Sequence, residues 1–214
     1  MVLVMTEEHA GKRPRSWEYY DRRAAEGTRT IGHALAYWTG LGVEATAADI
    51  EVEARQVQRL LRGMEPATFV EVGAGPGTFT SDLAGWGVAL DQSESALRVL
   101  RSGPAKTPVV RADALRLPLR DGAVGRAFAT HIYGLLGEQE RIAFLNETRR
   151  VAFRLVVVDA GRPAGVAPEQ WQQRALAGGE RFSIYRRHFD AEQLARELGG
   201  RALFSGRFYV VVTV

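Results

Sequence analysis

The chain has no cysteine, which excludes disulfide bonds, thiolate metal ligands and a cysteine nucleophile. It also has no apolar run long enough to span a membrane as a helix. The apolar start, residues 1–5, is shorter than the apolar core of a secretory signal peptide and no basic residues precede it. We therefore expect a cytoplasmic protein with no membrane partner, in which residues 1–14 form a disordered N-terminus.

Lysine is nearly absent, because Lys12 and Lys106 are the only two and arginine supplies the other basic side chains. The formal net charge is only +3, and the arginines are scattered among acidic residues. Proteins that bind nucleic acids usually carry a basic patch or stripe, so we expect no nucleic-acid partner. The length of 214 residues suits one domain with a helical extension, as a monomer or homodimer.

The most informative stretch is FVEVGAGPGTFT, residues 69–80. Its apolar beginning, residues 69–72, predicts a buried strand, and three alternate glycines predict a tight turn into a helix over 78–86. Glycines in such a turn let the backbone approach a ligand closely. A dinucleotide-binding fingerprint would place its third small residue at Thr78, whereas here it falls at Gly77. The spacing favours a nucleoside ligand other than NAD.

Two further expected strands end in an acidic residue. Residues 87–90 lead to Asp91, whose carboxylate can accept hydrogen bonds from both ribose hydroxyls. The alternative for Asp91 is that it only caps a helix expected over 95–101. The strand over 108–113 ends at Asp113, which can accept a hydrogen bond from an adenine amine.

Strands and helices alternate from residue 65 onwards, which predicts a doubly wound, mostly parallel sheet covered on both faces. The segment 161–183 is rich in glycine and proline, and we expect loop there with a short helix over 169–177. A tight turn near the C-terminus makes the last strand antiparallel. Further helices are expected over 17–26, 30–39 and 49–62, and further strands over 126–133, 155–159, 201–204 and 207–214.

In this order, the segments EVGAGPGTFT, ALDQSESAL and RADALRLPL resemble the class I S-adenosylmethionine-dependent methyltransferases. The match is to the small-molecule branch that includes ubiquinone and menaquinone biosynthesis enzymes. It covers residues 65–214 and implies a Rossmann-like fold with seven strands, over which residues 15–64 form a helical lid. Two features depart from the pattern: no Pro-Gly-Gly turn precedes the strand at 155–159, and the strand at 126–133 lacks an acceptor-class motif.

The resemblance assigns roles to particular residues. His131 falls where the fourth strand meets the expected methyl position, so it is the candidate base, with simple packing as the alternative. No metal is expected, since only Asp159 lies where a metal-dependent relative would need clustered acids. Expected acceptor-binding residues are His33, Tyr37, Tyr133, Trp171 and Tyr185. Expected cofactor-binding residues are Tyr20, Glu71, Gly73, Ala74, Gly75, Gly77, Asp91, Gln92, Asp113, Ala114 and Thr130.

The implied reaction is an in-line displacement that moves the methyl group of S-adenosylmethionine to a small-molecule acceptor and leaves S-adenosylhomocysteine. Positioning supplies most of the acceleration in such a reaction. Oxygen or nitrogen acceptors are favoured over carbon. Two alternatives stay open: an NAD-dependent oxidoreductase, which would not account for Asp113 or the terminal hairpin, and a regulatory protein that binds the nucleoside without turnover.

Overall fold

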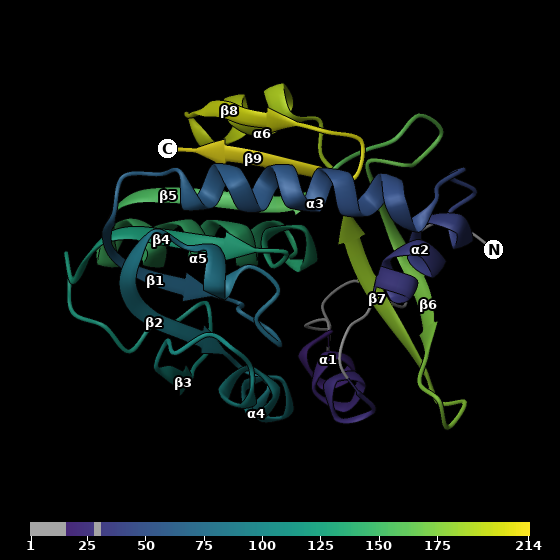
Figure 1. Ribbon diagram of the computed structural model, residues 1–214, viewed down its shortest axis with the longest axis horizontal. Coiled ribbons are helices and arrows are strands. Elements are labelled where there is room, and N and C mark those ends of the chain that lie inside the picture. The colour runs from purple at the N-terminus through teal and green to yellow at the C-terminus, as the bar shows by residue number, and fades with distance from the viewer. Residues whose placement is uncertain (1–15, 28–30) are drawn as a thin grey trace.

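The computed structural model describes residues 16–27 and 31–214, so the expectation for residues 1–14 lies outside the described residues. A seven-stranded sheet forms the centre of the molecule, with strand order β3-β2-β1-β4-β5-β9-β8 (Figure 1). Its strands are β1 (Ala67–Val72), β2 (Gly85–Asp91), β3 (Val109–Arg111), β4 (Val124–Thr130), β5 (Ala152–Ala160), β8 (Arg201–Ser205) and β9 (Tyr209–Thr213).

Strands β1 to β5 run parallel, whereas β9 is antiparallel to both of its neighbours, β5 and β8. The predicted fold is confirmed in this respect. Val72 lies opposite Leu90 of β2 and Ala129 of β4, so these three strands end at the same edge. The strand order reverses between β1 and β4, and ligands of such sheets bind outside the carboxyl ends at this point.

Helices cover both faces of the sheet, because successive residues of a strand point to opposite sides. Ile50 and Leu61 pack with Phe69 on one face, and Phe144 and Leu194 pack with the neighbouring strand residues on the other. The helices that supply these contacts are α3 (Ala47–Arg62), α5 (Glu138–Val151) and α6 (Ala191–Leu198), while α4 (Glu94–Ser102) packs beside β2 and β3.

Residues 78–86 do not form the predicted helix. They contain only the 3-10 turn η2 (Thr80–Asp82), and β2 already begins at Gly85. The six residues of β1 rise by about 20 Å, and the chain must return that distance to start β2 parallel to β1. The residues left after the glycine turn would span only about 10 Å as a helix but about 20 Å when extended. The prediction was wrong because this connection is too short to return as a helix.

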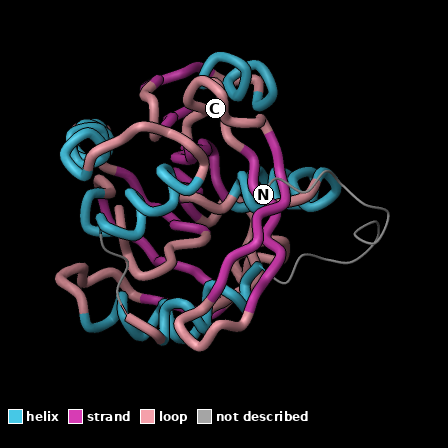
Figure 2. Tube along the Cα trace, turned by 90° about the vertical axis from the view of Figure 1, so that its right-hand side faces the viewer, coloured by secondary structure: helices cyan, strands magenta, loops and turns pink. Residues whose placement is uncertain are grey.

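The short helix predicted over 169–177 is also absent. Instead β6 (Glu169–Ala175) and β7 (Arg181–Arg187) pair as a separate antiparallel hairpin. Gly179 has a φ of +82° in its turn, a conformation that favours glycine. The hairpin stands beside the carboxyl edge of the main sheet, next to α1 (Ser16–Ala25) and α2 (Ile31–Gly40) (Figures 1 and 2).

Candidate active site

A cavity of about 1190 Å³ lies between the carboxyl edge of the parallel strands and the β6–β7 hairpin. Helices α1 and α2 contribute further walls. The sheet side is lined by the glycine turn after β1 and by the residues that follow β2, β3 and β4. Ligand pockets of about 300–1,000 Å³ hold drug-sized molecules, so this space can accommodate a nucleoside cofactor with a small acceptor beside it.

The glycine turn places its backbone against the cavity. Gly73, Ala74 and Gly75 line it as predicted, whereas Gly77 does not. A side chain on Gly75 would meet no atom within 4 Å, so the missing side chain there leaves open space for a ligand. A Cβ on Gly77 would instead collide with Leu100 of α4. Gly77 therefore serves helix packing, and its contact with the cofactor stays a prediction.

The two predicted acids both line the cavity. Asp91 accepts hydrogen bonds from the backbone N–H groups of Gly75 and Ser93, each at 2.8 Å. Burial raises the pKa of Asp91, and these hydrogen bonds oppose the rise. Each carboxylate oxygen has a further lone pair that can accept from a ligand hydroxyl. Asp113 accepts from the N–H of Leu115 at 2.9 Å. The predicted residues Gln92, Ala114 and Thr130 line the same wall.

Glu71 lies behind this wall, fully buried and outside the cavity lining. The hydroxyls of Thr80 and Thr130 donate to its two oxygens at 2.6 and 2.9 Å. Burial raises the pKa of Glu71 to about 7, and the nearby charges of Asp91 and Asp82 act in the same direction. Glu71 thus fastens the turn after β1 to the end of β4, and its direct contact with the cofactor stays a prediction.

His131 follows β4 and has a φ of +59°, in the left-handed region that non-glycine residues rarely adopt. Its ring lines the cavity and stacks on Phe79, with 6.0 Å between centroids. Behind the ring, Nδ1 lies 3.4 Å from Nη2 of Arg186 and 3.9 Å from Oδ1 of Asp159. Arginine can only donate, so the contact with Arg186 favours the tautomer of His131 that carries its hydrogen on Nε2. In that tautomer the ring is a hydrogen-bond donor, which fits the predicted base role poorly.

A buried ion pair between Arg186 and Asp159 holds His131 in place. Arg186 donates to Asp159 at 2.6 Å, and the second oxygen of Asp159 accepts from the N–H of Gly134 at 2.8 Å. Burial alone would lower the pKa of Arg186, but Asp159 raises it above its usual value. Arg186 also donates to the backbone carbonyl of His131 at 3.2 Å. The pair fixes the unusual backbone conformation of His131, since strained residues persist only where their surroundings hold them.

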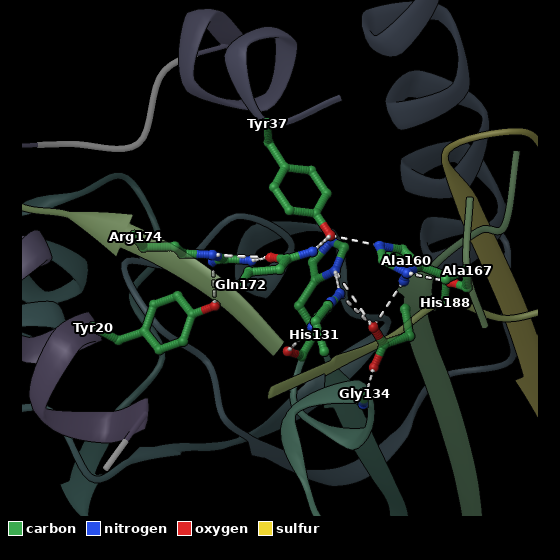
Figure 3. Close-up of polar contacts among 11 residues, drawn as sticks. Tyr20, Tyr37, His131, Gly134, Ala160, Ala167, Gln172, Arg174 and His188 are labelled. Atoms are coloured by element: carbon green, nitrogen blue, oxygen red, sulfur yellow. Dashed lines mark hydrogen bonds and ion pairs between the residues drawn. The ribbon is translucent and has the colours of Figure 1, made fainter. Parts of the chain in front are cut away.

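The hairpin side of the cavity carries a chain of polar contacts (Figure 3). The hydroxyl of Tyr37 lies 2.6 Å from Nε2 of His188, whose Nδ1 lies 3.2 Å from the carbonyl oxygen of Ala167. Burial lowers the pKa of His188 to about 3, and the charge of Arg186 adds to the effect. His188 is thus neutral, with Nδ1–H donating to Ala167 and Nε2 accepting from Tyr37. The amide of Gln172 donates to the same hydroxyl at 3.3 Å.

Three of the predicted acceptor-binding residues, His33, Tyr37 and Trp171, line the cavity, as does the predicted cofactor contact Tyr20. Tyr133 does not, since it is only 1 % exposed and its hydroxyl donates to Glu197 at 2.8 Å. The 3-10 turn η3 (Tyr133–Leu135) directs its ring into the core.

Tyr185 is outside the cavity lining too. Its hydroxyl donates to Glu169 at 2.6 Å across the hairpin. The positions of Tyr185 and Tyr133 outside the lining do not support their predicted role in acceptor binding, which stays a prediction.

Sequence analysis missed Gln170, Gln172 and Arg174, which line the cavity from β6. They share one face because side chains alternate along a strand. Polar residues at alternate positions could have predicted a strand with one polar face, but we expected a helix over these residues.

Among the described residues, no group of three or more histidine, aspartate or glutamate side chains is arranged to hold a metal ion. None of the helices in the described part of the chain is long and apolar enough to cross a membrane.

Residues 70–153 match the family model described as a methyltransferase domain. A DhpI–SAM–HEP complex is similar in structure, with 20% identity over 92% of this chain and 94% of that chain and a TM-score of 0.69. The glycopeptide N-methyltransferase MtfA gives 20% identity, 76% and 88% coverage and a TM-score of 0.54. A SAM-dependent methyltransferase from Aquifex aeolicus gives 18% identity, 75% and 87% coverage and a TM-score of 0.51. No curated protein matches the chain.

Proposed function

We propose that this chain is a class I methyltransferase that transfers the methyl group of S-adenosylmethionine to a small organic acceptor held between the sheet edge and the hairpin. The methyl donor of this class is S-adenosylmethionine, and the product that remains is S-adenosylhomocysteine. The observation that carries the proposal is the meeting of Gly75, Asp91 and Asp113 in one cavity at the edge where the strand order reverses.

Each part of the cofactor has a matching group along this edge. Asp91 accepts from the ribose hydroxyls through the lone pairs that Gly75 and Ser93 leave unused. Asp113, with Ala114 beside it, faces the adenine. The open backbone of the glycine turn borders the methionine part. The charge on the carboxylate of Asp91 makes its hydrogen bonds to hydroxyls stronger than those of a neutral acceptor.

The chemical step needs alignment above all. The acceptor oxygen or nitrogen attacks the methyl carbon, the bond from carbon to sulfur breaks, and the sulfonium becomes a neutral thioether. We propose that Nε2–H of His131 donates a hydrogen bond to the acceptor and so orients it, because Arg186 occupies Nδ1. With this tautomer the ring takes up no proton, so the acceptor attacks as a neutral amine or as an oxygen that is already ionised.

Helices α1 and α2 are proposed as the lid over this cavity, because both contribute lining residues. The sequence predicted a lid over residues 15–64, whereas the proposed lid includes only α1 and α2. Helix α3 belongs to the core, since Ile50, Val57 and Leu61 are fully buried against the sheet.

Calorimetric titration with S-adenosylhomocysteine and, separately, with NAD tests the proposed cofactor. We expect micromolar binding of S-adenosylhomocysteine and none of NAD, and loss of at least tenfold in affinity in Asp91→Asn. Binding of NAD alone would overturn the proposal. Binding of S-adenosylhomocysteine without methyl transfer to any of a panel of small amines, alcohols and acids would favour the regulatory alternative.

A further inference from the structure

Arg174 is a cation on the hairpin wall of the cavity and has no carboxylate partner among the described residues. It is half-buried and lines the cavity from β6. No ion pair joins it to an aspartate or glutamate among residues 16–27 and 31–214. Two other arginines that line the cavity are paired, Arg186 with Asp159 and Arg23 with Glu26, whereas Arg181 has no ion pair among the described residues but is exposed. Charged groups away from bulk water are usually paired, so this position favours a negatively charged ligand.

Neutral groups hold the guanidinium of Arg174 in a fixed orientation (Figure 3). Nε and Nη2 donate to Oε1 of Gln172 at 3.1 and 2.5 Å, and Nη1 donates to the hydroxyl of Tyr20 at 2.8 Å. The ring of Tyr37 lies 5.0 Å from the guanidinium carbon. These contacts use three of the five N–H groups of an arginine, which leaves one N–H on each terminal nitrogen. A planar pair of donors of this kind matches two oxygens of a carboxylate or phosphate.

The same strand carries a second donor, which has no hydrogen-bond partner among the described residues. Nε2 of Gln170 is buried and makes no hydrogen bond within the described part of the chain. Gln170 lines the cavity two and four residues before Gln172 and Arg174, on the same face of β6. A buried donor without a partner is costly, and an oxygen of a bound anion would satisfy it after a small side-chain shift.

We propose that the methyl acceptor carries an anionic oxygen group, such as a carboxylate or a phosphate, which binds to Arg174 within the site formed by Tyr20, Tyr37, Gln170 and Gln172. The inference rests on the proposed methyl transfer and adds the chemical class of the acceptor.

The position of Arg174 separates this site from the cofactor site. Asp91 and Asp113 lie on the sheet edge, and their negative charges suit a ligand rich in hydroxyl and amine donors. Arg174 lies on β6 and lines the cavity from the hairpin, which stands beside this edge of the sheet (Figure 1). The carboxylate of the cofactor's own methionine part is the competing oxyanion, and binding measurements distinguish the two.

The test uses the whole chain and four proteins: wild type, Arg174→Gln, Arg174→Lys and the matched control Arg22→Gln. Arg22 lies on α1, pairs with Glu180 at 2.5 Å and does not line the cavity, so its loss removes one nearby charge without touching the site. Each protein is titrated with S-adenosylhomocysteine. The proteins saturated with it are then titrated with millimolar acetate, benzoate and inorganic phosphate.

We expect all four proteins to bind S-adenosylhomocysteine within threefold of each other. At least one oxyanion probe should bind wild type and Arg22→Gln equally. It should bind Arg174→Gln at least tenfold more weakly. The affinity of Arg174→Lys should be intermediate, since lysine keeps the charge but lacks the planar pair of N–H donors.

Three results would overturn the inference: none of the oxyanions binds wild type, Arg174→Gln binds them unchanged, or Arg174→Gln loses affinity for S-adenosylhomocysteine by tenfold. The last result would assign Arg174 to the cofactor's carboxylate. If wild type fails to bind S-adenosylhomocysteine at all, the proposed cofactor is wrong, and oxyanion titration of the ligand-free proteins still tests Arg174.

Discussion

Acidic residues near the carboxyl edge of the sheet differ in function because their surroundings differ. Asp91 faces the cavity and is held by backbone N–H groups, which favour its charged form. Glu71 is one strand away, fully buried, and receives only two hydroxyl donors. Burial disfavours a charge more than two neutral hydrogen bonds favour it. The pKa values of the two side chains lead to different predictions.

The stability of the protein should depend on pH through Glu71. Its pKa in the folded protein is raised to about 7 from an unfolded value of 4.5, so between these values the folded state binds a proton that the unfolded state has lost. The free energy of unfolding therefore falls as the pH rises from about 4.5 to about 7, by roughly 3 kcal/mol for a shift of this size. Glu71→Gln should remove this decline, as measured by urea unfolding at several pH values.

The same variant tests whether Glu71 touches the cofactor. A glutamine can hydrogen-bond to both Thr80 and Thr130 without a charge, so Glu71→Gln should bind S-adenosylhomocysteine within threefold of wild type. A tenfold loss of affinity, with the fold intact by circular dichroism, would restore the direct contact predicted from the sequence.

Asp91→Asn should weaken binding of S-adenosylhomocysteine by ten- to a hundredfold. The substitution replaces charge-assisted hydrogen bonds to the ribose, which contribute about 1.5–3 kcal/mol, and presents an amide donor to one of the hydroxyls. Calorimetric titration measures the loss. An unchanged melting temperature without ligand would show that the bonds to Gly75 and Ser93 were not the cause. Unaltered affinity would return Asp91 to the role of a helix cap.

The His131→Asn variant tests whether His131 acts as a hydrogen-bond donor or as a general base. Asparagine tolerates a positive φ better than most residues, and its amide can donate as Nε2–H does. We expect turnover to fall by no more than about tenfold with the first acceptor that wild type methylates. Loss of a general base would instead cost about 10²–10⁴. A loss in that range, with S-adenosylhomocysteine binding unchanged, would contradict the donor role.

Strands with strong local signals were predicted correctly from the sequence, whereas the strands of the β6–β7 hairpin, which depend on each other, were not. Strand β1, the turn after it and the reversed strand β9 have the apolar runs and glycines that define them locally. Strand β6 does not, because EQWQQRA is polar and poor in residues that favour strands. It is extended because β7 pairs with it along its whole length. A single segment cannot reveal that pairing, so Gln170, Gln172 and Arg174 on the hairpin side of the cavity were not predicted.

The carboxylate of Asp21 joins helix α1 to the start of α4. Asp21 accepts from the hydroxyl of Ser93 at 2.8 Å and the N–H of Ser95 at 2.9 Å. Burial alone would raise the pKa of Asp21, but the hydrogen bonds from Ser95 and Ser93 hold it below its usual value. The ionised carboxylate also suits the positive end of a helix.

Asp21→Ala should therefore loosen α1. At about 1 kcal/mol for each hydrogen bond lost, we expect amide hydrogen exchange over residues 16–25 to accelerate by roughly ten- to thirtyfold. If α1 acts as a lid, binding of S-adenosylhomocysteine should weaken by about three- to tenfold. Asp21→Asn, which keeps an acceptor, should lie between. Unchanged exchange in Asp21→Ala would show that other contacts hold α1.

At the scale of the whole molecule, the cavity joins residues that lie far apart in the chain. Tyr37 and His188 are in contact although 151 positions separate them, and Arg174 reaches Tyr20 across 154 positions. Spacing within motifs predicted the acids and glycines of the cofactor side, because each follows its own strand. No spacing predicted the hairpin side, since its composition follows from how the lid helices and β6 pack together.

Because the cavity lies between the sheet, helices α1 and α2 and the hairpin, a ligand that fills it should stabilise the whole fold. A ligand at a hundred times its dissociation constant adds about 2.7 kcal/mol to the free energy of unfolding when it binds only the folded state. A domain of this size gains about 2–4 °C in melting temperature per kcal/mol. We therefore expect S-adenosylhomocysteine at that concentration to raise Tm by about 5–10 °C, and NAD at the same concentration to leave it unchanged. The Asp91→Asn protein should need at least tenfold more S-adenosylhomocysteine for the same rise. An equal rise in both proteins would mean that the ligand stabilises the fold from a site other than this cavity.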